Sequence, residues 1–389
     1  MLVGAASLLA AGLITACSTL TTDFVFVTSA KAAGSNNYGE IDIFEVNSES
    51  GAMRQIPASP IPSGGRNPVA EAVSADNANL FVVNHDDNTI VQFIIGNDGK
   101  LYPYNTVNTP GIYPMAVAVN ASNLFVVNTY QPLSTCSSAA PCSGSVGVFP
   151  VNAATSSAPV TLGTPVTNSA NSAQYWPLAV SGKPSDVIVP TAVALAGSNL
   201  YVSAYDASVT PHTGYIFAFT VGTGGALSAV AGSPFAAGAQ PSSVALDGSG
   251  KYLYATDYVN NKVLGFSVAS GVLTQLSGSP YAAGNAPSAV VVDPSYNFVY
   301  VANSTDSSVS AYSMSSGVLT RTATYSSGLN PVAIGVDPST HHFLYSVNFL
   351  GTSVSSWELS TTDGTLLVAQ GSPFTSNSEP TAVAAVPHK

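Results

Sequence analysis

The 389 residues predict an all-β protein, a seven-bladed β-propeller built from four-stranded antiparallel blades. Two observations carry this expectation. Three kinds of strand-like segment each recur seven times, in units of about 45 residues. Helical periodicity is absent after the N-terminal segment. Units of this size cannot bury their apolar faces alone, so they are expected to pack against one another around a common axis.

The first recurring segment is a proline followed by a mostly apolar strand. Its seven copies are PVAEAVS from Pro68, PMAVAVN from Pro114, PTAVALA from Pro190, PSSVALD from Pro241, PSAVVVD from Pro287, PVAIGVD from Pro331 and PTAVAAV from Pro380. A strand that is apolar on both faces is expected to be buried on both sides. We therefore expect this segment to be the innermost strand of each blade, next to the axis.

The second and third recurring segments are each centred on an aromatic residue. In the second kind the aromatic residues are Phe26, Phe81, Phe125, Tyr201, Tyr254, Tyr300 and Tyr345. In the third kind they are Phe44, Phe93, Phe149, Phe219, Phe266, Tyr312 and Trp357. A more variable fourth segment, typified by GVLTQLSGSPYAAG, completes each four-stranded unit.

The order of segments at the two ends predicts how the ring closes. The first recognisable strand, 23–28, is of the second kind, and the last, 381–386, is of the innermost kind. The C-terminal strand is therefore expected to join the N-terminal blade, which removes an exposed sheet edge.

Composition limits the classes of partner. Charged residues make up only 7% of the chain, against roughly 25% in typical globular proteins. The net charge is -11 with nine Lys and Arg, so no basic surface is expected to neutralise phosphates, and nucleic acid is excluded as a partner. An anionic membrane surface is disfavoured for the same reason.

The first sixteen residues, MLVGAASLLAAGLITA, form an apolar run that is short for a membrane span and typical of a secretory signal. Residues 14–17 resemble a bacterial lipobox, which would make Cys17 the lipid-modified first residue of the mature protein. We therefore predict a signal peptide over 1–16, a linker over 17–22 and the propeller over 23–389, anchored at the cell envelope by lipid alone. An ordinary cleaved signal or a buried N-terminal strand is the alternative.

Cys136 and Cys142 lie close together in STCSSAAPCSG, within one expected loop. Exported proteins fold in an oxidising compartment, so this spacing favours a small-loop disulfide over two free thiols. No His or second Cys pair lies nearby in sequence, so a zinc site is not expected there.

The spacing between the second and third aromatic residues identifies three elaborated blades. It is twelve residues in four blades, eighteen from Phe26 to Phe44 and from Tyr201 to Phe219, and twenty-four from Phe125 to Phe149. Blade three therefore carries an insertion at 129–145. A second insertion at 152–189 is expected because Phe149 and Pro190 are forty-one residues apart, against nineteen to twenty-four between the equivalent positions of the other blades. We expect Tyr175 and Trp176 in the second insertion to form an aromatic lid beside the loop of Cys136 and Cys142. A loop without a function is the alternative.

The runs LFVVNHDDNTIVQF, LYATDYVNNKVLGF and FVYVANSTDSSVSAY look like YVTN-type repeats. Seven such units resemble the seven-bladed propeller lactonase family, which includes 6-phosphogluconolactonase and carboxymuconate cyclase-like proteins. The resemblance covers roughly 23–389. It implies the propeller fold and, as an expectation, hydrolysis of a small lactone at the mouth of the central channel.

The loops after the second strand and before the innermost strand of a propeller open on the same face, where a ligand site is expected. Hydrolysis of a lactone needs a general base and a donor for the developing oxyanion. The candidate catalytic residues in these loops are Arg66, His85, Asp86 and Glu379. The candidate ligand-binding residues are Tyr113, Tyr130, Tyr175, Trp176, Tyr205, Asp257 and Tyr258. The alternative is that these are solvated loop residues that serve turn geometry.

Two functions stay open at this point. One is a lactone hydrolase acting on a small lactone or sugar-like ligand, and the other is a non-catalytic propeller that recognises a cell-surface glycan or protein. No cofactor and no metal ion is expected, because the sequence holds no phosphate loop, dinucleotide fingerprint or zincin motif. A monomer is expected.

Overall fold

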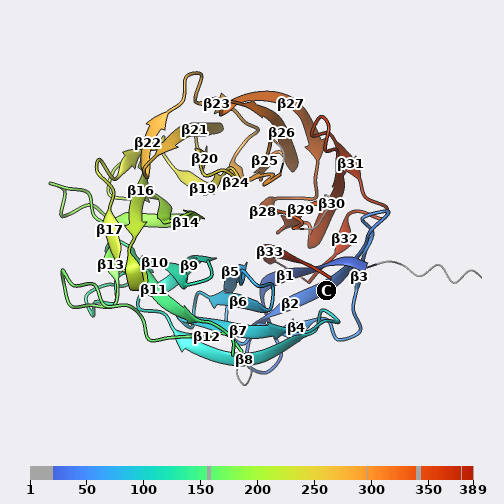
Figure 1. Ribbon diagram of the computed structural model, residues 1–389, viewed down its shortest axis with the longest axis horizontal. Coiled ribbons are helices and arrows are strands. Elements are labelled where there is room, and N and C mark those ends of the chain that lie inside the picture. Colours follow the sequence, from blue (N-terminus) through green and yellow to red (C-terminus); the bar gives the residue numbers. More distant parts are fainter. Residues whose placement is uncertain (1–20, 156–158, 296, 339–342, 378, 389) are drawn as a thin grey trace, which may run out of the picture.

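The computed structural model describes residues 21–155, 159–295, 297–338, 343–377 and 379–388, and these form a ring of seven antiparallel sheets around a central axis (Figure 1). This confirms the predicted seven-bladed propeller. Apart from a short 3-10 turn, η1 (Thr223–Gly225), the regular elements of the described residues are β-strands. The candidate signal peptide and Cys17 lie outside the described residues.

Each blade runs from an inner strand at the axis to an outer strand at the rim. The inner strands of blades 1 to 7 are, in that order, β33 (Pro380–Pro387), β5 (Pro68–Val73), β9 (Ile112–Val119), β14 (Ile188–Ala196), β19 (Pro241–Leu246), β24 (Pro287–Val292) and β28 (Pro331–Val336). The second strands are β1 (Thr21–Ala33), β6 (Asn79–Asn84), β10 (Asn123–Tyr130), β15 (Asn199–Asp206), β20 (Tyr252–Asp257), β25 (Phe298–Asn303) and β29 (Phe343–Asn348).

The third strands of the seven blades are β2 (Tyr38–Asn47), β7 (Thr89–Ile95), β11 (Ser145–Asn152), β16 (Thr213–Val221), β21 (Lys262–Ala269), β26 (Ser308–Ser315) and β30 (Ser353–Leu359). The outer strand is continuous in blade 2, as β8 (Leu101–Asn108), and in blade 6, as β27 (Val318–Ser326). In the other blades it is split into β3 (Met53–Gln55) with β4 (Ile61–Pro62), β12 (Thr161–Leu162) with β13 (Trp176–Pro177), β17 (Leu227–Ala229) with β18 (Phe235–Ala236), β22 (Val272–Gln275) with β23 (Tyr281–Ala282), and β31 (Leu366–Val368) with β32 (Phe374–Thr375).

A Ser-Pro pair separates the two halves of the outer strand in four of the split blades. The serine hydroxyl accepts a hydrogen bond from a backbone N–H of the neighbouring third strand, as from Ile43 to Ser59 and from Gly265 to Ser279, at 2.8 and 2.9 Å. The outer strand leaves the sheet at that point, so its backbone carbonyl no longer accepts from this N–H of the third strand. The serine hydroxyl accepts the hydrogen bond instead. The short sequence SP in the variable fourth segment therefore marks the break in the outer strand.

The two predicted series of aromatic residues form the core between the blades. All seven aromatic residues of the second strands have no exposed surface, and those of the third strands are at most 6% exposed. Two of the tyrosines also link neighbouring blades, since the hydroxyl of Tyr254 donates to the carbonyl of Gly317 and that of Tyr300 to the carbonyl of Gly364, at 2.7 and 2.8 Å. Burial explains why this position is aromatic in every blade, and the hydroxyl adds a blade-to-blade hydrogen bond in some of the blades that hold Tyr.

The ring closes where the C-terminal strand β33 pairs with β1, as predicted. The pairing is antiparallel and runs from Asp23 opposite Pro387 to Ser29 opposite Pro380. The hydroxyl of Thr381 donates to the carbonyls of Thr28 and Pro68, so β33 is tied both to its own blade and to blade 2. Figure 1 shows the red C-terminal strand lying beside the blue N-terminal strands.

A carboxyl group lies beside this closing strand, in an environment that the sequence did not reveal. Glu71 is the one charged residue in the seven inner strands, at the position that holds Val117, Val193, Val244, Val290, Ile334 and Val383 in the other blades. Its Oε2 accepts a hydrogen bond from the hydroxyl of Thr28 on β1 at 2.5 Å. Part of the residue is accessible, but its Oε1 is shielded from water.

Burial raises the pKa of Glu71 to about 8, and hydrogen bonds from Thr28 and from the N–H of Ala384 oppose this only in part. Asp42 on β2 holds the segment that leads into β33. Its carboxylate accepts the N–H of Asn377, three residues before that strand, at 2.7 Å. Burial raises the pKa of Asp42 to about 6. Two buried carboxyl groups with raised pKa values therefore contact the segment that closes the ring.

We expect removal of Pro380–Lys389 to abolish folding. The truncated chain would expose the edge of β1 and the apolar side chains that β33 covers, such as Val25 and Val27. Circular dichroism melting and size-exclusion chromatography should show loss of the cooperative transition and aggregation. Removal of only 388–389, beyond the end of β33, is the control and should leave the cooperative transition intact, with at most a small shift from the lost contact of His388 with Phe24. A folded monomer lacking the whole of β33 would contradict the closure mechanism.

We expect Glu71→Gln to stabilise the protein at pH 8 and to flatten its pH dependence between pH 6.5 and 8.5. The unfolded chain loses the Glu71 proton near pH 4.5, whereas the folded chain keeps it to about pH 8, so stability falls as the pH rises through this window. At 1.36 kcal/mol per pKa unit the whole shift corresponds to about 5 kcal/mol, of which about 2 kcal/mol is lost between pH 6.5 and 8.5. Asp42 contributes mainly below this window, because its pKa is about 6.

Chemical denaturation at several pH values measures this effect. Glu71→Val, which installs the residue found at this position in most other blades, should behave like Glu71→Gln. Glu49→Gln removes a carboxylate from an exposed turn and serves as the matched control. Identical slopes of stability against pH in wild type and Glu71→Gln would show that Glu71 is already ionised in the folded protein.

Candidate functional site

The loops predicted to share one face of the ring do meet. The loop that precedes β5 contacts the β6–β7 loop, since the backbone N–H of Arg66 donates to Asp87 at 2.7 Å and that of His85 donates to the carbonyl of Asn67 at 3.0 Å. The start of β5 and the end of β6 are held together because Pro68 pairs with Asn84. We call this face, where the inner strands begin, the mouth.

His85 and Asp86 form a hydrogen-bonded pair at the mouth. The Nδ1 of His85 lies 2.6 Å from the Oδ1 of Asp86, and Asn67 donates to the same carboxylate oxygen at 3.1 Å. Desolvation would raise the pKa of Asp86, but the hydrogen bonds from His85 and Asn67 outweigh it, so the pKa is lowered. An ionised Asp86 favours the imidazole tautomer with its proton on Nδ1, which leaves Nε2 able to accept a proton.

Arg66 lies beside this pair but is bound to a carboxylate that the sequence analysis did not single out. Its Nε and Nη2 lie 2.7 and 2.6 Å from the Oδ1 of Asp87, and Nη2 also donates to the carbonyl of Asp86 at 3.4 Å. The hydrogen bond and the charge of Asp87 raise the pKa of Arg66. About half of the Arg66 side chain is exposed, so the guanidinium faces solvent with its charge largely balanced.

A row of aromatic rings continues from His85 across blades 2, 3 and 4. The imidazole stacks on Tyr113 with ring centroids 4.7 Å apart, and Tyr113 meets Tyr130 edge-on at 5.9 Å. Tyr205 meets His212 at 5.0 Å, and the pKa of Tyr205 is raised by burial and by Tyr130 nearby. All five rings are partly exposed.

The sequence predicted Tyr113, Tyr130 and Tyr205 on one face, and the structure brings them together. His212 was missed. It lies in the extended β15–β16 hairpin, and the number of extra residues there did not show which of them would reach the mouth.

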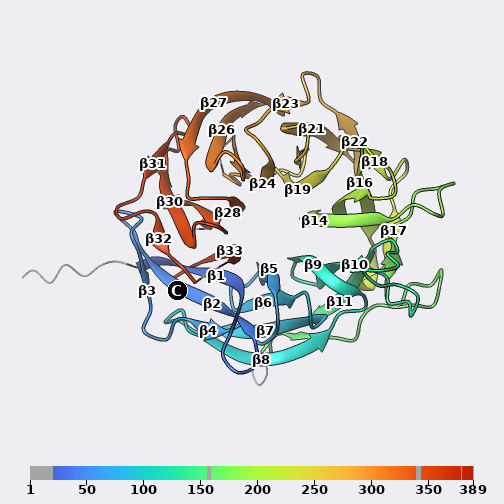
Figure 2. The same ribbon diagram turned by 180° about the vertical axis from the view of Figure 1, so that it is seen from behind.

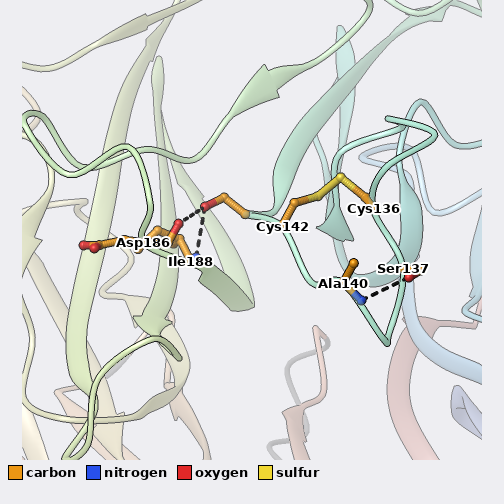
Figure 3. The surroundings of a disulfide bond; sticks show 7 residues. Cys136, Ser137, Ala140, Cys142, Asp186 and Ile188 are labelled. Carbon is orange, nitrogen blue, oxygen red and sulfur yellow. Dashed lines mark hydrogen bonds between the residues drawn. A yellow bond between two sulfur atoms is a disulfide. The ribbon is translucent and has the colours of Figure 1, made fainter.

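The disulfide between Cys136 and Cys142 is confirmed, with the two Cα atoms 5.5 Å apart. It closes a turn in the β10–β11 loop, and the next residue fixes this loop to the segment before β14 (Figure 3). The hydroxyl of Ser143 donates to the carbonyl of Asp186 at 2.8 Å and accepts the N–H of Ile188 at 3.0 Å. The two insertions of blade 3 therefore contact one another at the mouth.

The second insertion of blade 3 does not form the expected aromatic lid. Trp176 pairs with Val146 as part of the outer strand β13 and is only 7% exposed, within the core shared by blades 3 and 4. Residues 163–175 bulge between the two halves of the split outer strand, at the position where other blades hold a Ser-Pro turn. Tyr175 is half-buried at the end of this bulge. The expectation of an exposed lid containing Trp176 is therefore wrong.

The other candidates lie on blades 1 and 5. Asp257 is buried at the end of β20, where its carboxylate accepts the N–H groups of Ala239 and Gln240 and so fixes the loop before β19. Tyr258 follows it and is 38% exposed. Glu379 is exposed and immediately precedes β33, and its backbone carbonyl accepts the N–H of Ala30. A ligand role for any of these residues stays a prediction.

Within the described part of the chain, no cluster of three or more His, Cys, Asp and Glu residues is arranged to hold a metal ion. Among the residues that the structure describes, the helical element η1 has three residues, and no helix could span a membrane.

Comparison with known proteins agrees with this architecture. A family model described as a seven-bladed β-propeller lactonase matches residues 272–384, less than a third of the chain. The match runs from the outer strand of blade 5 to the closing strand. No curated protein sequence matches the chain.

Similar solved structures share the fold at low sequence identity. The periplasmic gluconolactonase PpgL of Pseudomonas aeruginosa aligns with a TM-score of 0.71 and 17% identity, covering 94% of this chain and 99% of that one. A candidate 6-phosphogluconolactonase of Bacteroides fragilis aligns with a TM-score of 0.70 and 17% identity, covering 95% and 99%. The chain is thus a seven-bladed propeller whose C-terminal blades match the propeller lactonases, the family that its repeats resemble.

Proposed function

We propose that this protein hydrolyses a small, uncharged lactone at the mouth. The observation that carries the proposal is the 2.6 Å contact between His85 and Asp86, beside the exposed guanidinium of Arg66 and at one end of the aromatic row. A base oriented by a carboxylate next to a cationic donor is the arrangement that ester hydrolysis by water requires. The lactonase match in the C-terminal blades supports the same class of reaction.

In the proposed reaction the Nε2 of His85 takes a proton from a water molecule, whose oxygen attacks the lactone carbonyl carbon. The N–H groups of Arg66 would donate to the oxyanion that develops on the carbonyl oxygen. The ring C–O bond then breaks, and the proton held by His85 passes to the leaving oxygen. The product is a hydroxy acid, which releases one proton to solvent at neutral pH.

The pairing of Arg66 with Asp87 at the mouth favours an uncharged substrate over a phosphorylated one. Asp87 already occupies two nitrogens of Arg66, so a phosphate would have to compete with a carboxylate that is held in place. Aromatic faces such as Tyr113 and Tyr130 can instead pack on the apolar face of a ring.

The length of the aromatic row supports a second candidate, a propeller that binds a glycan without turning it over. Five partly exposed rings from three blades provide more contact than one small lactone needs.

Export to the cell envelope is part of the proposal. The disulfide of Cys136 and Cys142 requires an oxidising compartment, and a structural neighbour is a periplasmic enzyme. Lipid attachment at Cys17 follows from the sequence alone. Mass spectrometry of the membrane fraction, which would show the diacylated N-terminus, tests it.

We expect the purified protein to hydrolyse neutral lactones and His85→Gln to lose 10²- to 10⁴-fold in kcat, the range that a general base contributes. Asp86→Asn should lose less, because it keeps the shape but not the charge that orients the imidazole. Proton release in weakly buffered solution containing a pH indicator measures turnover.

His388→Gln is the matched control. β33 begins at the mouth with Pro380, and His388 follows its other end. No turnover on any lactone, or equal turnover by wild type and His85→Gln, would exclude this reaction. Binding of oligosaccharides by the inactive wild type would then favour the second candidate.

We expect Asp87→Asn to shift the substrate preference towards phosphorylated lactones. Removing the carboxylate frees the guanidinium of Arg66, and a charge-assisted hydrogen bond to phosphate corresponds to about a tenfold gain or more. The measurement is the ratio of kcat/KM for a phosphorylated and an unphosphorylated lactone of the same ring. An unchanged ratio would show that Asp87 does not set the preference for neutral substrates.

A further inference from the structure

A cavity lies between blades 1 and 2, beside the lengthened β1–β2 hairpin, and neither His85 nor Asp86 lines it. It has a volume of about 540 Å³. One wall is the tip of the β1–β2 hairpin, residues 33–36, with Tyr38 at its base. The other wall is the outer part of blade 2, formed by Phe93, Leu101 and Pro103.

The lengthened β1–β2 hairpin builds this cavity. The aromatic spacing predicted six extra residues here, and the structure shows that they extend the two strands rather than form a loose loop, since Ala33 still pairs with Tyr38. The chain reverses between Gly34 and Asn37, which have φ angles of 67° and 54°. Figure 2 shows this blue hairpin reaching across the strands of blade 2. The hairpin tip is exposed, so its extra residues are not needed to close the ring.

The lining defines the chemistry of a ligand. Phe93 and Leu101 are buried in the core between blades 1 and 2 and give the cavity a rigid apolar floor. Lys, Arg, Asp and Glu are absent from its described lining, while the hydroxyl of Tyr38 and the side chain of Asn36 offer polar groups at the hairpin side. A largely apolar cavity with few polar groups and a volume between 300 and 1,000 Å³ is typical of small-molecule sites.

We propose that this cavity, which we call the hairpin cavity, binds a neutral small molecule with an apolar body and one or two polar groups. A charged ligand would have to be desolvated without a counter-charge on the lining, which is costly. An alkyl chain or a ring system would pack on Pro103 and Ile61, above the buried Phe93 and Leu101, and leave its polar end near Tyr38. The cavity borders the mouth, since Tyr38 lies close enough to Arg66 to contribute to its raised pKa, but neither His85 nor Arg66 lines it.

The test uses the uncharged dye N-phenyl-1-naphthylamine, whose fluorescence rises in apolar surroundings. We expect saturable binding of one dye per chain at micromolar concentration. Ala33→Phe places a ring inside the cavity and should weaken the binding at least tenfold. Ala32→Phe adds the same ring at the neighbouring exposed alanine, which does not line the cavity, and should bind as wild type does.

Competition identifies the class of ligand. 1-Decanol should displace the dye at a concentration at least several-fold lower than decanoate does, because only the alcohol is uncharged. Melting temperatures of both variants should match wild type, since Ala32 is exposed and the ring at Ala33 would enter an open cavity rather than the core. Absence of saturable dye binding, or equal binding by the folded Ala33→Phe protein, would overturn the proposed site. Equal displacement by decanol and decanoate would overturn the assignment to neutral ligands.

Discussion

The pairing of β33 with β1 is the constraint on which the rest of the ring depends. It joins residues more than 350 positions apart in the sequence, as between Phe24 and Val386. Bringing such distant residues together costs the conformational entropy of the whole intervening chain. The pairing of β33 with β1 can therefore be stable only once the other blades have formed. Both buried carboxyl groups with raised pKa values, Glu71 and Asp42, contact segments of this closure. Closing the ring therefore couples folding to pH in a direction opposite to that of a salt-bridged carboxylate.

The fold could be predicted because its pattern is written seven times. A single apolar segment such as PSAVVVD would be ambiguous, but seven copies at a steady spacing determine strand type, order and burial together. The aromatic residues at the centres of the second and third strands could be predicted as core residues because they recur at the same position in every blade, and they are buried in every blade. The order of segments at the termini was sufficient to predict closure, because a propeller blade lacking its inner strand leaves one unsatisfied edge.

Features that occur once were predicted less well. The spacing in blade 3 showed how many residues were inserted, but it could not distinguish a loop at the mouth from a bulge between two halves of an outer strand, and so misplaced Trp176. The loop positions correctly grouped His85, Tyr113 and Tyr130. They did not show which carboxylate would bind Arg66, because Asp86 and Asp87 are adjacent and only the backbone geometry selects between them. Glu71 stands out in its strand, but its partners lie on β1 and β33, at the two ends of the chain.

The scarcity of charge gives the mouth its chemical character. The chain carries 20 acidic and nine basic residues, and cations at the mouth, such as Arg66 and Lys183, already lie beside carboxylates. Such exposed pairs add little stability, so their main effect is on the local field. A guanidinium that shares two nitrogens with Asp87 can still polarise a carbonyl through its remaining donors, but it offers a dianion little net attraction. The same pairing that would let Arg66 assist hydrolysis of a neutral ring would therefore select against a phosphorylated one, so that a single carboxylate, Asp87, would set the choice of substrate.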